Sequence, residues 1–323
     1  MGIIDELLTR PEFADRPPVL FDVGASGHVH AKWRPIARYC VCVAFDADRR
    51  EMGYLSKTDG GFRTLHVCPA VVTDRPEATL PFYLTASPFC SSLLPPDPAA
   101  VSEWLFAPLF VVERTIELPA TTLRKVMADL KLDRVDWVKC DSQGTDLRLF
   151  RSLGDELGRR ALAAEFEPGF MDVYQGEDTL GDVLTHMRGR PFYLADLVVH
   201  TQVRVRRAYA EQLRGASRRF LHALVKAAPG WGEMTFLNTM RDADADGLGA
   251  REWLLAWVFA VVEEQLGFAL DLATRAAARF PDPVFARLVA ESSAMLRRTA
   301  RRRLPGLVVR RAWAKATSVF RRG

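Results

Sequence analysis

The sequence predicts an α/β protein with a doubly wound sheet, followed by an all-helical C-terminal region. Short apolar runs alternate with helical stretches of about 10–15 residues, which is typical of βαβ units. Several runs end at a glycine or an aspartate, at the edge of the sheet where such folds bind ligands. From about Val203 the pattern changes to long stretches with helical spacing and many arginines.

The first predicted strand, residues 19–23, is an apolar run that ends at a glycine loop, the pattern of a buried parallel strand. Between residues 80 and 98 five prolines interrupt the pattern, so we expect a hairpin or a long loop there. Further strands are expected at residues 41–45, 65–72, 110–118, 135–140, 161–166 and 191–199, and helices at residues 30–39, 120–130, 145–157 and 179–187.

The charge of the chain divides where the pattern changes. Residues 1–200 hold 22 lysines and arginines against 29 acidic residues, a balance of −7, and residues 201–323 hold 22 against 11, a balance of +11. This asymmetry indicates two units with different partners. We therefore predict a helical lead-in at residues 1–18, a sheet domain at 19–202 and a basic helical region at 203–323, with helices at 207–228, 250–280 and 283–303.

The sequence gives no indication of a metal, secreted or membrane-spanning protein. The five cysteines lack CxxC or zinc-like spacing, so we expect buried thiols in a reducing compartment and no metal site. The N-terminus lacks the apolar core of a signal peptide, and the longest apolar run, residues 253–262, is about half of a spanning helix. We expect a cytoplasmic protein, at most peripheral to the inner face of the membrane.

The loop after the first predicted strand, Asp22-Val23-Gly24-Ala25-Ser26-Gly27, allows the backbone to approach a ligand closely. Asp46 ends the next strand, where a carboxylate accepts hydrogen bonds from the ribose hydroxyls of a nucleoside. The GxGxxG pattern of dinucleotide-binding loops is absent, and Asp22 would repel a pyrophosphate but attract a sulfonium. These charges favour S-adenosylmethionine over a nicotinamide dinucleotide. A plain glycine turn with two surface aspartates is the alternative.

Seven stretches of the chain, in order between residues 19 and 199, resemble the FkbM-type methyltransferases. They are Phe21–Ala25, Ala44–Asp46, Ala70–Asp74, Ser91–Leu94, Val135–Asp146, Glu165–Glu167 and Tyr174–Gly176. The most specific part is Lys139-Cys140-Asp141-Ser142-Gln143-Gly144, which is similar to the KxDxQGxE motif of that family. The resemblance extends over more than half of the chain.

The resemblance implies a Rossmann-like class I methyltransferase fold and methyl transfer from S-adenosylmethionine to a hydroxyl of a glycan or a secondary metabolite. The residues that it places around the cofactor are Asp22, Gly24, Ala25, Ser26 and Gly27 of the first loop, Asp46 at the ribose, and Ala70. Asp46 and Asp146 stand where the family more often has glutamate, and Ser26 stands where it usually has asparagine.

A hydroxyl is a poor nucleophile at neutral pH, so a general base should assist the transfer. Asp141 is the first candidate, because it ends a buried strand at the edge where the cofactor is expected. Lys139, two residues earlier on the same strand face, is expected to orient it, and Glu165 is the next candidate base. The alternative is that Asp141 caps the helix that begins at Thr145 by binding backbone N–H groups.

Two further patterns in the sequence have plainer interpretations than a metal site. His28 and His30 share one side of an extended loop, but no third metal ligand accompanies them, so we interpret them as polar loop residues. Residues 242–247, Asp-Ala-Asp-Ala-Asp-Gly, resemble half of a calcium-binding EF-hand loop, but Trp253 stands at the position of the bidentate glutamate. We expect a solvated loop between helices there.

The C-terminal residues 296–323 mix arginines with apolar residues. Such a segment can rest on an anionic membrane, bind nucleic acid or form a solvated helix face, and the mixture of arginines and apolar residues favours the first and the last. The alternative to a methyltransferase is a catalytically silent Rossmann-like binding module whose helical C-terminal region mediates interactions.

Overall fold

The computed structural model describes residues 2–25, 30–46, 61–241 and 247–320, with residues 305–320 described by their backbone alone. The chain divides into two compact units, residues 1–248 and 249–323. The first unit holds both sheets of the protein that the structure describes, and the second consists of helices.

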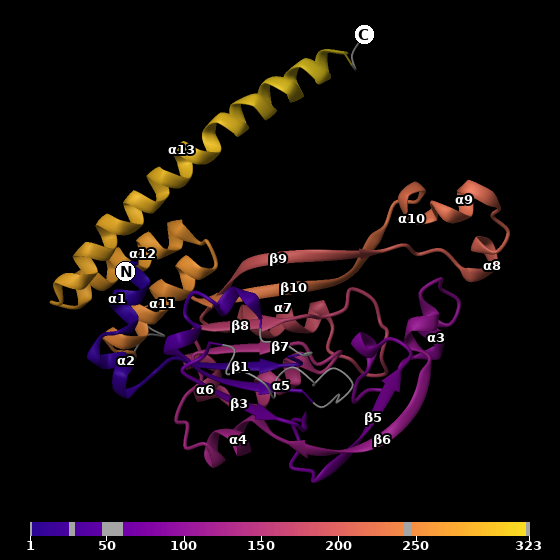
Figure 1. The fold of residues 1–323 in the computed structure, drawn as a ribbon, viewed down its shortest axis with the longest axis horizontal. Helices are drawn as coiled ribbons and strands as arrows, with labels where there is room; N and C mark the ends of the chain where they lie inside the picture. The colour runs from indigo at the N-terminus through magenta and orange to yellow at the C-terminus, as the bar shows by residue number, and fades with distance from the viewer. Residues whose placement is uncertain (1, 26–29, 47–60, 242–246, 321–323) are drawn as a thin grey trace. The chain divides into compact units, whose positions relative to one another are not determined.

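The first unit is built on a seven-stranded sheet with the order β3-β2-β1-β7-β8-β10-β9 (Figure 1). Neighbouring strands run parallel from β3 to β8, and β10 is antiparallel to both of its neighbours. The strands are β1 (Val19–Val23), β2 (Val41–Phe45), β3 (Thr64–Cys68), β7 (Trp137–Cys140), β8 (Ala163–Phe166), β9 (Phe192–Gln202) and β10 (Ala228–Asn238). The predicted α/β sheet is confirmed, and its order is compatible with a Rossmann-like fold.

The central strands form because their side chains are buried on both faces of the sheet. Every residue of β1 and β8 is buried, which explains why these strands read as continuous apolar runs. The rings of Phe21 and Phe45 meet edge to face with centroids 5.5 Å apart, and those of Phe150 and Phe166 do so at 5.4 Å. These rings belong to one core that joins the sheet to its helices.

Two of the predicted helices of this unit are interrupted, each for a local reason, whereas the helix predicted at 179–187 is confirmed. Residues 30–39 form two 3₁₀ turns, η1 (Ala31–Trp33) and η2 (Ala37–Tyr39), because Pro35 between them has no N–H for a continuous helix. The predicted helix at 145–157 divides into α5 (Asp146–Ser152) and α6 (Asp155–Arg160) at Gly154, whose φ is 82°. The other helices are α1 (Ile3–Leu8), α2 (Pro11–Asp15), α4 (Leu123–Asp129) and α7 (Leu180–Arg188).

A second, three-stranded sheet has the order β4-β6-β5. It consists of β4 (Val71–Val72), β5 (Thr79–Thr85) and β6 (Val112–Thr121), and β5 tolerates Pro81 because it is an edge strand of this sheet. The long connection between β5 and β6 contains η3 (Pro88–Cys90), α3 (Pro98–Val101) and η4 (Ala107–Phe110). The proline-rich stretch is therefore a strand followed by a long connection.

The prediction of an all-helical region from Val203 onward is wrong for residues 203–248, because they include the strand β10. β10 has the alternating burial of a strand: Gly230, Gly232 and Met234 are buried, and Trp231 and Glu233 are exposed. The predicted helix at 207–228 consists of three short helices, α8 (Arg207–Ala210), α9 (Gly215–Arg219) and α10 (Leu221–Leu224). They lie at the end of the long ribbon that β9 and β10 form (Figure 1). Because β10 belongs to the sheet, the first unit extends to residue 248 and does not end at residue 202.

The second unit consists of α11 (Ala250–Val262), α12 (Leu266–Arg279) and α13 (Pro283–Phe320), which confirms the helical prediction for this part. The predicted helix at 250–280 is interrupted at Glu264, whose φ is 54°. Trp257 on α11 donates a buried hydrogen bond of 2.8 Å to the hydroxyl of Ser292 on α13. Among the helices that the structure describes, none combines the length and the apolar composition needed to cross a membrane.

Candidate functional site

A cavity of about 430 Å³ opens at the carboxyl ends of the central strands in the first unit. Four residues predicted from the sequence line it: Gly24 after β1, Asp46 after β2, Ala70 after β3, and Asp141 after β7. This position follows from the fold, because parallel strands leave their loops at one edge of the sheet. The predicted Ser26 and Gly27 lie outside the described residues.

The ionisable lining of the cavity is acidic. Asp46, Asp141, Glu167 and Glu177 line it, and within the described part of the chain no lysine or arginine does. An acidic cavity attracts a cation and repels phosphate groups. The same surface includes many aromatic and aliphatic side chains, among them Phe45, Phe82, Phe89, Phe106, Phe110, Tyr174 and Trp231.

The first loop is held against the neighbouring strand. Gly24 has a φ of 82°, and its backbone N–H and that of Ala25 both donate to the carbonyl of Phe45, at 2.9 and 3.1 Å. A Cβ atom at Gly24 would lie 1.8 Å from the carbonyl oxygen of Asp141, so only glycine fits there. Since both N–H groups are already used, this part of the loop has no donors to offer to a pyrophosphate.

Beneath the cavity a row of polar side chains crosses the sheet. Asp22, Lys139 and Glu165 are register partners on β1, β7 and β8, so their side chains point to the same face. Lys139 Nζ lies 3.7 Å from Asp22 Oδ1, while Glu165 accepts hydrogen bonds from Trp137 Nε1 at 2.6 Å and Lys32 Nζ at 2.8 Å. None of the three row residues lines the cavity. Glu165, a predicted base, is thus bound to two donors away from the cavity.

The charges in this row depend on one another. Burial raises the pKa of Asp22, although Lys139 partly opposes that shift. Burial by itself would lower the pKa of Lys139, but the carboxylates of Asp141, Asp22 and Glu165 raise it well above its usual range. Lys139 therefore stays protonated and compensates the charge of the carboxylates around it.

Asp141 lies at the centre of the polar groups that line the cavity. Gln143 Nε2 donates to its Oδ1 at 2.9 Å, and Lys139 Nζ lies 3.6 Å from its Oδ2. Glu167 also hydrogen-bonds to Asp141, and burial together with the Asp141 charge raises the pKa of Glu167 to about 9. At neutral pH Glu167 therefore keeps its proton, with which it hydrogen-bonds to Asp141.

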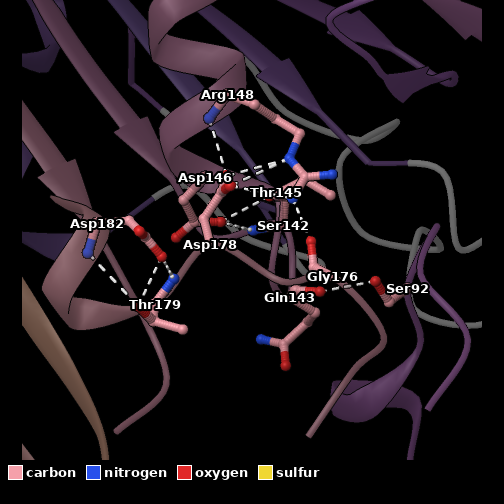
Figure 2. Close-up of polar contacts among 10 residues, drawn as sticks. All are labelled: Ser92, Ser142, Gln143, Thr145, Asp146, Arg148, Gly176, Asp178, Thr179 and Asp182. Carbon is pink, nitrogen blue, oxygen red and sulfur yellow. Dashed lines mark hydrogen bonds and ion pairs between the residues drawn. The ribbon is translucent and has the colours of Figure 1, made fainter. Parts of the chain in front are cut away.

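Asp146, and not Asp141, binds the backbone of the loop after β7 (Figure 2). It accepts from Ser142 N at 2.8 Å, Ser142 Oγ at 2.6 Å and Glu167 N at 2.7 Å, so it ties the loops after β7 and β8 together. Burial raises the pKa of Asp146 to about 6. Within the described residues, the Asp141 carboxylate accepts no backbone N–H, which argues against the alternative that it caps α5.

A second tie fixes the wall of the cavity formed by residues 174–179 (Figure 2). The Arg148 guanidinium on α5 pairs with Asp178 at 3.0 Å and also donates to the carbonyl of Gly176. Asp178 further accepts the backbone N–H of Arg148 at 2.9 Å. On the opposite side, Ser92 Oγ donates to the carbonyl of Gln143 at 2.7 Å. The cavity loops are thus held by side chains that lie outside the cavity.

Sequence reasoning missed Glu167, Tyr174 and Glu177 as parts of the site. Tyr174 donates to the carbonyl of Cys90 at 2.9 Å and to Gln143 Oε1 at 3.3 Å, and burial raises the pKa of Glu177 to about 7. Glu167 stands two residues after Glu165 and therefore on the same strand face, closer to the carboxyl edge. That alternation was the one signal in the sequence that pointed to it.

Of the weaker candidates, those that the structure describes do not line the cavity. His30 accepts the backbone N–H of Lys32 at 3.3 Å through Nδ1 and caps η1, and His28 lies outside the described residues. The aspartates of the calcium-like run, residues 242–246, also lie outside them, and Glu252 accepts the N–H of Gly249 at 2.9 Å as α11 begins. The basic C-terminal residues belong to α13, whose Arg301, Arg302 and Arg303 are exposed.

In comparisons with known proteins, no family model, curated protein or solved structure matched this chain. The geometry of the site therefore carries the functional argument.

Proposed function

We propose that this protein is an S-adenosylmethionine-dependent methyltransferase that acts on a hydroxyl oxygen of a small molecule or glycan. The observation that carries the proposal is the cavity at the carboxyl edge of the sheet, whose ionisable lining is acidic and which Gly24, Asp46 and Asp141 share. A sulfonium ligand matches that charge, and a dinucleotide does not.

The fold supports the same proposal. The order of the seven strands, with the single reversed strand β10 between β8 and β9, agrees with the class I methyltransferase fold that the FkbM resemblance implies. The loops after β1, β2 and β3, where the resemblance places the cofactor, line the cavity through Gly24, Asp46 and Ala70.

The residues present fit the cofactor. The buried Asp46 would accept hydrogen bonds from the ribose hydroxyls. The first-loop N–H groups are bonded to Phe45, so this loop would contact the cofactor by close backbone approach and not by cradling phosphates. When bound, S-adenosylmethionine supplies an electrophilic methyl group whose transfer releases a neutral thioether.

In this proposal the Asp141–Glu167 pair takes up the proton of the acceptor hydroxyl. Asp141 receives the proton while Glu167 remains protonated, and the Lys139 ammonium lies 3.6 Å from the Asp141 carboxyl group. Gln143 fixes the orientation of Asp141 through its 2.9 Å hydrogen bond. Alignment of the two reactants provides the larger part of the rate, because oriented groups reach effective molarities of about 10⁵–10⁸ M.

Titration calorimetry with S-adenosylmethionine tests the proposal directly. The wild type should bind it, and Asp46→Asn should lose the charge-assisted bonds to the ribose, about 1.5–3 kcal/mol or roughly 10- to 150-fold in affinity. Asp129→Asn, at an exposed aspartate on α4, is the matched control and should bind like the wild type. No binding by the wild type would favour a catalytically silent module instead.

A further inference from the structure

Residues 204–226, which we call the ribbon tip, combine positive charge with exposed apolar side chains. They include six arginines and one lysine against a single acidic residue, Glu211. All seven of these cations are exposed. The tip includes α8, α9 and α10 and lies at the far end of the β9–β10 ribbon (Figure 1).

The base of the ribbon tip is fixed to the rest of the first unit. Leu105 N donates to the carbonyl of Val205, and Arg207 N donates to that of Glu103, both at 2.9 Å. The Arg206 guanidinium pairs with the Glu103 carboxylate at 3.1 Å. Ala210 and Leu221 are buried within the tip. The tip therefore presents its surface from a defined position.

Most of the charge on the ribbon tip is not neutralised by the protein. Within the part of the chain that the structure describes, no carboxylate pairs with Arg207, Arg214, Arg218, Arg219 or Lys226. These cations stand close together in sequence and repel one another. A surface of this kind is stabilised by an anionic partner.

Three large apolar side chains are exposed among these cations. Tyr209 is 58% exposed, Phe220 52% and Leu224 67%. A surface that only interacts with water or with phosphates gains nothing from exposed phenylalanine and leucine side chains. Alternating cations and apolar side chains are instead typical of segments that lie in the headgroup region of a membrane.

We propose that the ribbon tip docks on an anionic lipid surface. The arginines contact the headgroup phosphates, and Phe220 and Leu224 enter the boundary between headgroups and acyl chains. Nucleic acid would satisfy the arginines but would leave the aliphatic Leu224 without a partner. The proposal is independent of the methyltransferase assignment, because it rests on the ribbon tip alone.

Vesicle sedimentation with the full chain tests this docking. Phosphatidylcholine vesicles with and without about 30% phosphatidylglycerol are compared for the wild type, Arg218→Gln/Arg219→Gln and Phe220→Ser/Leu224→Ser. We expect binding to the anionic vesicles only, and a loss of roughly 25-fold for the double arginine variant, since each cation contributes about fivefold. The Phe220→Ser/Leu224→Ser variant should lose its binding in high salt, where only the apolar contribution remains.

The matched control is Arg301→Gln/Arg302→Gln, which removes two exposed arginines from α13. This variant should keep most of the binding, and all variants should keep the far-ultraviolet circular dichroism of the wild type. Failure of the wild type to bind anionic vesicles would overturn the proposal, as would binding lost in the α13 variant and retained in both tip variants. Binding of labelled duplex DNA through Arg218 and Arg219, without vesicle binding, would also overturn it.

Discussion

At the scale of single residues, two of the carboxyl groups that line the cavity, those of Glu167 and Glu177, bind protons more tightly in the folded protein than in the unfolded chain. Burial raises the pKa of Glu167 from 4.5 to about 9 and that of Glu177 to about 7. Above pH 4.5 the unfolded chain has released protons that the folded protein still holds. These two residues therefore lower the free energy of unfolding as the pH rises toward their folded pKa values.

Glu167→Gln should remove most of this loss of stability at rising pH, because the amide does not titrate. The variant should gain stability relative to the wild type between pH 5 and pH 8, on the order of 2 kcal/mol and at most about 1.4 kcal/mol per pH unit. Urea unfolding at both pH values measures the difference. The exposed Glu156→Gln, whose wild-type side chain belongs to α6, should show no such pH-dependent gain. An equal gain in both variants would contradict the argument.

Asp141→Asn should abolish methyl transfer while leaving the affinity for S-adenosylmethionine near the wild-type value. The amide cannot take up the hydroxyl proton, but it keeps the shape of the side chain and can still contact Gln143. Single-turnover rates together with calorimetry separate the two effects. Full activity of this variant would refute the role of Asp141 as a base.

Gly24→Ala should destabilise the protein by more than its backbone conformation alone requires. Gly24 and Gly61 have similar φ values, 82° and 76°, but only at Gly24 would a Cβ atom meet the backbone of Asp141. Gly61→Ala should cost about 1 kcal/mol, the penalty of a positive φ, and Gly24→Ala several kcal/mol. Chemical denaturation of both variants gives the difference, and equal losses would show that the contact with Asp141 is unimportant.

At the scale of secondary-structure elements, α5 is tied to the loop of residues 174–179 through Arg148. Arg148→Gln should lower the free energy of unfolding by about 1–2 kcal/mol, since the partly buried Asp178 loses its cationic partner. The loop carries Tyr174 and Glu177 of the cavity wall, so acceptor KM should rise as well. Arg159→Gln breaks an exposed pair with Asp155. It should change the free energy of unfolding by no more than a few tenths of a kcal/mol and should leave the acceptor KM unchanged.

The sequence predicted elements best where burial alone determines them. β1, β2, β7 and β8 were placed to within two residues, because strands buried on both faces appear as uninterrupted apolar runs. β10 was missed since its exposed Trp231 and buried Gly230 and Gly232 mask the usual hydrophobic alternation. The helix predicted at 30–39 is too long, because Pro35 has no N–H for a continuous helix.

The candidate site was predicted in part for a related reason. Gly24, Asp46 and Asp141 follow strands directly, so the rule for parallel sheets locates them without any three-dimensional information, whereas Ala70 was predicted from the family resemblance alone. Glu167, Tyr174 and Glu177 reach the cavity through side-chain direction and loop folding. No periodicity in the sequence indicates those contacts, which is why Glu165 and not Glu167 was predicted as a base.

At the scale of the whole molecule, cofactor binding should be confined to the first unit. Hydrogen exchange with and without S-adenosylmethionine should show added protection in residues 19–25, 41–46 and 139–144, whose loops form the cavity. Residues 266–304 of the second unit should exchange at unchanged rates. Protection spread evenly over both units would indicate that the helical unit participates in cofactor binding.

The reversed strand β10 has a consequence for how this architecture can diversify. Since β9 runs parallel to β8 and β10 returns beside it, the connection between them leaves the sheet at the same edge as the cavity. Residues 203–227 can lengthen, shorten or be exchanged there without shifting any pairing among the seven strands. Gln202, Gly230 and Trp231 flank that connection and line the cavity. Inherited variation there can thus alter one side of the cavity while the loops after β1, β2 and β7 stay constant.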